Sequence, residues 1–260
     1  MTNDQSRRLG EFLMSIRPAP LAAALKILLR VRRLEITTPD GVFWIDPGSY
    51  MGLRLLQHGV YEAELLATVK TLLHPGDTFV DVGANEGYFS VVASCAVGSS
   101  GRVLAIEPQS RLGPVLKKNL ALNGCTNVLI SAMAVSDRQG RAELYLTPSL
   151  NNGASSIIRP TKYPLFRQTI TTATLEELLD QYRVEQCALM KIDIEGWEYE
   201  AVLGSRQVFR SGRVRALALE LHPHLLEARG LDINEITNFL FDCGYREIPG
   251  QGHLLLVHDA

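Results

Sequence analysis

Acidic and histidine side chains follow two apolar runs of this sequence, at positions where strands would end. Asp193 and Glu195 come after the run ALMKI, and His222 comes after the run RALALEL. Ligands bind beyond the carboxyl ends of parallel strands, so we expect these three side chains to share one edge of a sheet. A carboxylate or an imidazole there can remove a proton from an alcohol. The residues predict a base, Asp193 or His222, and a carboxylate, Glu195, that orients the substrate or the base.

The same side chains allow other interpretations. Asp193 and Glu195 could cap a helix that begins before Trp197, and His222 could be a structural histidine at a strand end. Asp193, Glu195 and Glu220 could also bind a divalent cation such as Mg²⁺, which would lower the pKa of an acceptor hydroxyl. Spacing alone does not show that three oxygens converge, so we do not favour a metal.

The stretch Thr78–Ser90 reads TFVDVGANEGYFS, which predicts a buried strand, a tight turn and a helix. Gly83 and Gly87 let the backbone turn sharply, and the first N–H groups of the helix would face a ligand in the turn. The dinucleotide pattern G-x-G-x-x-G would require glycine where Asn85 stands, which disfavours an NAD oxidoreductase. A P-loop would require a lysine after the last glycine. The turn therefore favours a nucleoside ligand that carries no phosphate.

Glu107 ends the next predicted strand, Arg102–Ile106, and lies 24 residues after Gly83. A carboxylate at this position can accept hydrogen bonds from both hydroxyls of a ribose. The glycine turn and Glu107 together predict S-adenosylmethionine as the cofactor. The simpler alternative is a tight turn followed by a helix-capping glutamate.

Two further contacts to this cofactor follow from the expected elements. The third strand, Asn127–Ala134, would end beside the adenine, so Met133 and Ala134 are candidate walls of that pocket. A helix is expected from Gly59 to about Leu73, with Glu62 in its first turn. Glu62 either stabilises that helix through its dipole or contacts the ammonium of the cofactor.

Composition limits the classes of partner. The chain has 260 residues and a net charge of −2, which argues against a nucleic-acid partner held by a broad basic face. Its four cysteines are scattered without a C-x-x-C pair, which is typical of a reduced, cytoplasmic protein. No run approaches about 20 apolar residues, so we expect no stable membrane insertion. The oligomeric state is left open.

The first 58 residues are expected to form a helical segment and a β-hairpin. Two helices flank the breaker Arg17-Pro18-Ala19-Pro20, and Leu34–Asp46 is typical of a hairpin. The second helix is basic and includes Lys26 and Arg30. It could touch a membrane surface or an acidic partner, or lie solvated on the domain, which is the interpretation we favour.

Residues 59–260 are expected to form one domain with an insertion at about 138–172. Strands are predicted at Arg141–Leu146 and Gln168–Thr172. The polar segment between them is typical of a lid or a substrate-binding loop. Its candidate hydrogen-bonding side chains are Asn151, Asn152, Ser155 and Ser156. Two closing strands, Tyr245–Ile248 and His253–His258, suit an antiparallel hairpin at a sheet edge.

These motifs resemble the FkbM family of S-adenosylmethionine-dependent methyltransferases. The matching pieces are Gly59–Glu62, FVDVGANEGYFS, AIEP, AVSD, KIDIEGWE and ELH, in family order over about residues 60–258. Glu86 departs from the family pattern, which usually has an apolar residue there. The resemblance implies an α/β, Rossmann-like class I methyltransferase fold. It has a seven-stranded, mostly parallel sheet with a C-terminal antiparallel hairpin and helices on both faces.

The resemblance also implies a reaction and a set of site residues. Family members most often methylate a hydroxyl of a sugar, glycan or secondary metabolite, so we expect a small-molecule or glycan acceptor. Asp81, Gly83, Asn85 and Gly87 would surround the methionine part of the cofactor, and Ala84 and Pro108 lie within the same motifs. A protein or RNA methyltransferase, or a non-catalytic module that retains the fold, are the alternatives.

Overall fold

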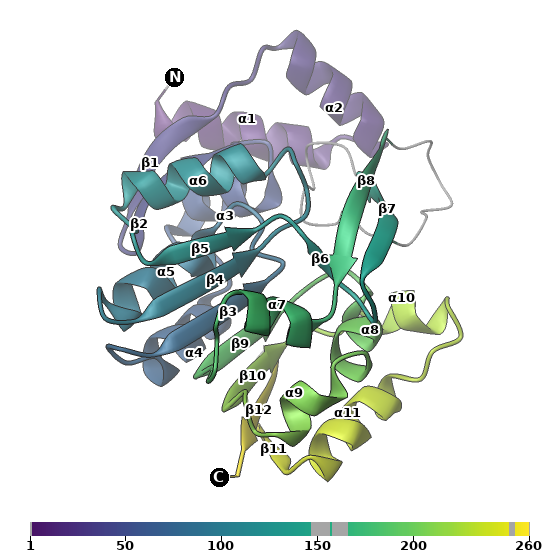
Figure 1. Ribbon diagram of the computed structural model, residues 1–260. Helices are drawn as coiled ribbons and strands as arrows, with labels where there is room; N and C mark the ends of the chain where they lie inside the picture. The colour runs from purple at the N-terminus through teal and green to yellow at the C-terminus, as the bar shows by residue number, and fades with distance from the viewer. Residues whose placement is uncertain (1, 147–156, 158–165, 250–252, 260) are drawn as a thin grey trace.

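The computed structural model describes residues 2–146, 157, 166–249 and 253–259, and its centre is a seven-stranded sheet (Figure 1). The strands are β3 (Thr78–Val82), β4 (Arg102–Ile106), β5 (Val128–Ser131), β9 (Leu189–Ile192), β10 (Ala216–Leu219), β11 (Tyr245–Ile248) and β12 (Leu254–His258). Their order is β11-β12-β10-β9-β3-β4-β5. From β10 to β5 all neighbours are parallel, whereas β12 pairs antiparallel with β10 and β11. The parallel sheet and its closing hairpin agree with the expected fold class.

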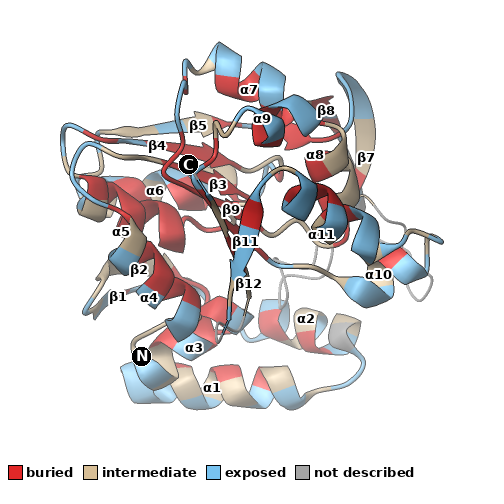
Figure 2. Ribbon diagram, turned by 90° about the horizontal axis from the view of Figure 1, so that it is seen from below, coloured by how far each residue is buried: buried red, intermediate tan, exposed pale blue. Residues whose placement is uncertain are grey.

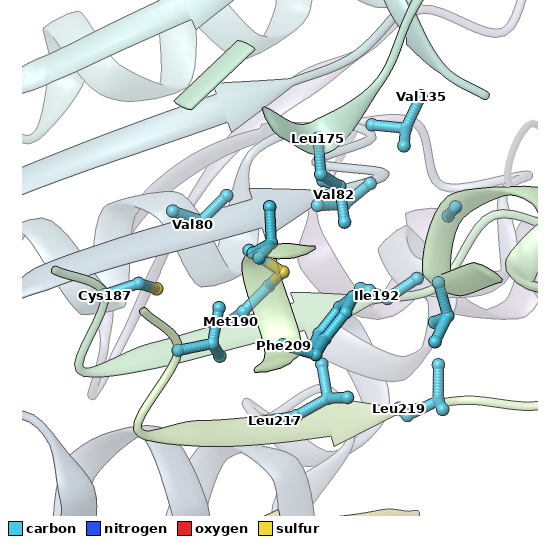
Figure 3. Packing of buried hydrophobic residues seen from close by; sticks show 14 of the residues in the cluster. Val80, Val82, Val135, Leu175, Cys187, Met190, Ile192, Phe209, Leu217 and Leu219 are labelled. Atoms are coloured by element: carbon cyan, nitrogen blue, oxygen red, sulfur yellow. The ribbon is translucent and has the colours of Figure 1, made fainter. Parts of the chain in front are cut away.

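Successive residues of the central strands pack into two different cores, because strand side chains alternate between the two faces. Val80, Met190 and Leu217 point to one face together with Phe209 (Figure 3). The helices on that face are α7 (Leu175–Gln181), α8 (Glu198–Leu203), α9 (Arg206–Arg210), α10 (Pro223–Glu227) and α11 (Ile233–Asp242). Burial of this parallel sheet on both faces explains why its strands are almost uninterrupted apolar runs.

The opposite face of the sheet is covered by α4 (Ala63–Leu72), α5 (Tyr88–Val97) and α6 (Gly113–Leu122). Phe79 and Leu189 pack there against apolar side chains of these helices. Figure 2 shows the resulting layers, with buried residues along the sheet and on the inner sides of the helices. The sheet is therefore held rigidly between two helical layers, and the loops at its carboxyl edge are free to build a site.

A second sheet lies beside the carboxyl edge of the first (Figure 1). It consists of β6 (Ala134–Val135), β7 (Gly140–Leu146) and β8 (Phe166–Ala173) in the order β6-β8-β7. The strands predicted around the insertion are confirmed. The segment between them lies largely outside the described residues, as do Asn151, Asn152, Ser155 and Ser156. Of that segment, Ile157 is described.

The prediction of a single strand over Asn127–Ala134 is wrong. β5 ends at Ser131, which pairs with Ile106, and Ala134 pairs with Thr172 of β8 in the smaller sheet. The N–H of Glu107 still donates to the carbonyl oxygen of Ser131, but the next N–H on that side, of Gln109, donates to the side chain of Glu107 instead. The chain therefore leaves one sheet and joins the other.

The N-terminal segment comprises α1 (Asn3–Ser15), α2 (Ala19–Leu28), β1 (Leu34–Thr38), β2 (Gly41–Ile45) and α3 (Tyr50–His58). The hairpin is confirmed, and Phe43 packs in the same core as α5. The structure adds α3, a helix that the sequence did not predict: Ser49 accepts the N–H of Gly52 and starts the helix there. Gly59 ends α3 rather than opening the next helix, which begins at Ala63. No helix in the described part of the chain is long and apolar enough to cross a bilayer.

Candidate active site

The turn between β3 and α5 has positive φ at three residues, Gly83, Asn85 and Gly87. Gly83 has φ +83°, and a Cβ there would lie 1.9 Å from the carbonyl oxygen of Asp193. Asn85 has φ +52°, which is uncommon for a residue with a side chain. Its Oδ1 is buried and has no hydrogen-bond partner among the described residues. The turn therefore offers an acceptor that a ligand could satisfy.

Glu107 closes the other side of this turn. Its Oε2 accepts the N–H of Asn85 and its Oε1 accepts the N–H of Gln109, each over 2.8 Å. A carboxylate oxygen has two acceptor positions, so both oxygens retain one for a ligand. Burial raises the pKa of Glu107 to about 7. Hydroxyl donors from a bound diol would stabilise its charged form.

Lys191 connects the turn to the end of β9. Its Nζ donates to the carbonyl oxygen of Gly83 over 2.8 Å. The same nitrogen lies 3.6 Å from Asp81 Oδ1 and 3.4 Å from Asp193 Oδ2. Burial by itself would lower the pKa of Lys191, but the surrounding carboxylates raise it above its ordinary value. Asp81 is fully buried and also accepts the hydroxyl of Ser90 over 2.6 Å.

Four titratable side chains converge where β9 and β10 end. His222 Nε2 lies 4.0 Å from Asp193 Oδ1 and 3.5 Å from Glu195 Oε2. On the other side of the ring, Nδ1 lies 2.9 Å from Glu198 Oε1. Glu198 Oε1 also accepts the N–H of Gly196 over 3.0 Å, and the side chain of Glu198 is fully buried. The imidazole is thus held between one buried carboxylate and two that face the cavity.

The charges of this cluster depend on one another. Burial alone would lower the pKa of His222, but the hydrogen bond and charge of Glu198, with the charges of Glu195 and Asp193, raise it to about 9. Burial raises the pKa of Glu195 to about 7. At neutral pH the imidazole therefore carries a proton, and Glu195 is divided between its two forms.

A cavity of about 510 Å³ lies between the turn and this cluster. Its walls come from the carboxyl edge of the sheet, from the small second sheet and from α1. The lining residues that matter most are Glu62, Asn85, Glu107, Asp193, Glu195 and Trp197. Arg17 and Met14 close it on the N-terminal side. One cavity therefore joins the predicted cofactor turn to the predicted base.

Six of the ten residues predicted for the cofactor line this cavity: Glu62, Gly83, Asn85, Glu107, Pro108 and Ala134. Asp81 and Ala84 are buried behind the turn, and a Cβ at Gly87 would lie 2.4 Å from Leu116 of α6. Met133 packs against the apolar core next to α7, so the continuous strand that was expected to bring it to the cavity is replaced by a bend. Of the predicted catalytic residues, Asp193 and Glu195 line the cavity, and the second base candidate, His222, contacts both.

Glu62 is the N-cap residue of α4 but makes no capping hydrogen bond with its side chain. Its φ is +45°, and it lines the cavity together with Tyr61. Burial, which outweighs the nearby Lys191 ammonium, raises the pKa of Glu62. A strained backbone and a carboxylate that leaves the helix uncapped both indicate that this side chain serves the cavity.

Sequence reasoning missed Glu198, Lys191 and Trp197 as parts of the site. Glu198 holds His222, Lys191 holds Gly83, and Trp197 donates from Nε1 to Ser136 Oγ over 3.2 Å. Lys191 stands inside an apolar strand, and a buried charge requires a partner there. A lysine inside an apolar strand could therefore have identified Lys191 as part of the site. Glu198 has no such signal, because helix starts are commonly acidic.

The structure also changes the group of side chains that could bind a divalent cation. Among the described residues, Asp193, Glu195 and His222 each offer one ligand atom within 4.8 Å of the others. Glu220 is not part of this group, although it lines the cavity. If a divalent cation binds, these three side chains are the ones that could hold it.

Glu86, the departure from the expected pattern, is explained by the N-terminal segment. Its carboxylate is buried and accepts two hydrogen bonds of 2.8 Å from the guanidinium of Arg33. This paired contact fixes the residues before β1 against the turn between β3 and α5.

Comparisons with known proteins match this chain to methyltransferases. A family model described as "Methyltransferase FkbM domain" matches residues 81–247. A probable cobalt-precorrin-6B C(15)-methyltransferase (decarboxylating) of Sulfurisphaera tokodaii is 36% identical over 69 residues, which are 26% of this chain and 36% of that protein. The chain therefore spans little more than a third of the length of this curated relative.

Solved structures similar to this chain include two methyltransferases. The methyltransferase FkbM from Methylobacillus flagellatus is 16% identical with a TM-score of 0.46, over 79% of this chain and 52% of that one. A putative rRNA methylase from Clostridium thermocellum is 10% identical with a TM-score of 0.45, over 75% of this chain and 94% of that one.

Proposed function

The chain belongs to the FkbM family of S-adenosylmethionine-dependent methyltransferases, and from that premise we propose that it methylates a hydroxyl oxygen of a sugar, a glycan or a secondary metabolite. One observation supports this most directly. The acidic and histidine cluster lies in the same cavity as the turn that would hold the cofactor. A hydroxyl needs both a methyl donor and a proton acceptor, and this cavity brings groups for the two together.

The residues present fit the cofactor. Asn85 Oδ1 is a buried acceptor without a partner, and Glu107 keeps acceptor capacity on both oxygens for a ribose diol. Glu62 adds a carboxylate for the ammonium group. When bound, S-adenosylmethionine supplies an electrophilic methyl group on a sulfonium. Much of the rate then comes from alignment of the acceptor oxygen by the cavity walls.

The proton of the acceptor would go to Asp193. His222 already holds a proton at neutral pH, because its pKa is about 9, so it is poorly suited as the base there. Asp193 is flanked by Lys191 Nζ and His222 Nε2, two cationic groups that fix its position. Glu195, which contacts the same imidazole, would orient the acceptor. His222 would act by holding both carboxylates.

Calorimetric titration with S-adenosylmethionine and S-adenosylhomocysteine tests the cofactor site. We expect Glu107→Ala to weaken both ligands by about 100-fold, since two donors from the ribose lose their acceptor. Glu247→Ala, an exposed glutamate on β11, is the matched control and should bind as the wild type does. Failure of the folded wild type to bind either ligand would contradict the proposal and favour a non-catalytic module.

The reaction is tested with a panel of glycosylated acceptors and methyl-labelled cofactor, with and without Mg²⁺. Asp193→Asn should lower kcat by about 100-fold or more while cofactor affinity stays within about threefold. Glu220→Gln, which changes another cavity carboxylate outside the cluster, should have a much smaller effect. Labelling of RNA or protein but of no hydroxylated small molecule would refute the acceptor class.

A further inference from the structure

The helix α2 exposes its large apolar side chains and buries its lysine. Ile27 and Leu28 are 76% and 77% exposed, and Leu21 and Leu29 are also exposed. The inner side of the helix holds Ala22, the partly buried Leu25 and Lys26, the last paired with the buried Asp46. This is the reverse of the pattern of a solvated surface helix, which turns its apolar side chains inward. A solvated helix, as favoured from the sequence, does not account for it.

Single exposed apolar residues are ordinary, but these are concentrated. Of the eight large hydrophobic side chains exposed in the described part of the chain, five come from α1, α2 and the residue after α2. These five are Phe12, Leu21, Ile27, Leu28 and Leu29. A concentration of exposed apolar side chains in one part of the chain is typical of an interaction surface.

The charged residues that flank Leu21–Leu29 in the sequence are all positive. No aspartate or glutamate occurs between Phe12 and Leu34. Arg30 and Arg32 follow the apolar residues directly and are exposed, whereas Arg33 is paired with Glu86. Arg30 also has φ +49°, at the helix end where glycine is usual. With Ile27, Val31, Arg32 and Lys26, it lines a shallow hollow at this end of α2.

We propose that Leu21, Ile27, Leu28, Leu29, Arg30 and Arg32, here called the α2 surface, bind the surface of an anionic lipid bilayer. Apolar side chains would enter the boundary between headgroups and acyl chains, and the two arginines would contact lipid phosphates. Charge complementarity favours this occupant, because apolar residues flanked only by cations suit an anionic interface. A second copy of this chain bound at the same surface would bring Arg30 and Arg32 of both copies together, and like charges repel.

The segment that precedes the α2 surface in the chain borders the cavity. Met14 near the end of α1, and Ile16 and Arg17 between α1 and α2, line its N-terminal side, and α1 and α2 lie together at one end of the molecule (Figure 1). A bilayer bound there would place lipid-carried hydroxyl acceptors next to the cavity, a consequence that rests on the proposed function. Membrane binding itself does not depend on that function.

The test is co-sedimentation of the full chain with phosphatidylcholine vesicles that contain phosphatidylglycerol, compared with pure phosphatidylcholine vesicles. We expect binding to the anionic vesicles that falls as salt is added, and little binding to the neutral ones. Removal of both charges in Arg30→Ala/Arg32→Ala should weaken binding about 30-fold, since each arginine near an anionic surface contributes about fivefold. Ile27→Ser/Leu28→Ser should weaken it at least about 10-fold.

Two matched variants separate this surface from general effects. Leu129→Ser removes an exposed leucine on β5, and Arg141→Ala removes an exposed arginine on β7, and both should leave vesicle binding unchanged. Titration of each variant with S-adenosylhomocysteine shows whether the variant is folded, independently of vesicle binding. Equal binding to neutral vesicles, no vesicle binding, or equal losses in the Leu129 and Arg141 variants would overturn the proposal. A dimer in sedimentation velocity that Ile27→Ser/Leu28→Ser dissociates would assign the surface to a second copy instead.

Discussion

The two halves of the cavity are built from different forces. The turn around Asn85 is held by backbone geometry and by N–H groups that donate to Glu107. The cluster around His222 is held by side-chain charges, with the imidazole between Glu198 and two cavity carboxylates. The turn should therefore be disturbed by substitutions that change the backbone, and the cluster by changes of pH. Lys191 belongs to both, because its ammonium contacts Gly83, Asp81 and Asp193.

Removal of that connection should have the largest effect. Lys191→Met leaves two carboxylates near β3 and β9 without their cation, one of them in fully buried Asp81. Loss of one partner from a buried ion pair typically costs about 3–5 kcal/mol. Urea unfolding should detect this loss. The added change Asp81→Asn should restore part of the stability, and no restoration would mean that Lys191 acts mainly through its bond to Gly83.

The shape dependence of the turn is tested with Gly83→Ala. The new Cβ would meet the carbonyl oxygen of Asp193 at 1.9 Å, so the backbone of the turn must move. We expect about 3 kcal/mol of destabilisation and loss of cofactor binding, measured by urea unfolding and calorimetry. Gly124→Ala is the control, since Gly124 also has positive φ but no atom lies within 4 Å of its Cβ position. That variant should lose only about 1 kcal/mol.

The charge dependence of the cluster is tested through pH. His222 has a folded-state pKa of about 9, above its ordinary 6.5, so its contribution to stability is complete below 6.5 and is lost as pH rises through 9. Integrated over that shift, the free energy of unfolding should fall by about 2 kcal/mol between pH 7 and pH 9. Glu198→Gln removes the first partner of the imidazole and should flatten this fall. An unchanged slope in that variant would contradict the role given to Glu198.

The smallest effect on stability is expected from Asn85→Gly. Asn85 has φ +52°, a conformation that glycine adopts without strain, so the free energy of unfolding should change by no more than about 1 kcal/mol. Loss of Oδ1 should nevertheless weaken S-adenosylhomocysteine about 10-fold in calorimetry. Affinity equal to that of the wild type would show that this buried oxygen does not serve the cofactor.

The difference between the two halves also explains which parts could be predicted. Glycine spacing, apolar runs and strand-end residues placed Gly83, Glu107 and Asp193 at one sheet edge, because parallel strands present their carboxyl ends together. Those features depend on the backbone, and the backbone of a buried parallel sheet follows closely from local pattern. The closing hairpin at the sheet edge follows for the same reason.

What the sequence determined by itself is the sheet, its order along the chain and the turn that faces the cavity. Tertiary structure alone decided the side-chain partners: His222 rather than Glu220 lies with Asp193 and Glu195, Glu198 holds the imidazole, and the strand expected to end at Ala134 divides between two sheets. It also turned Leu21 and Leu28 of α2 outward. The physical reason is that charge pairing and helix orientation depend on contacts between segments far apart in the chain, and no local pattern records them.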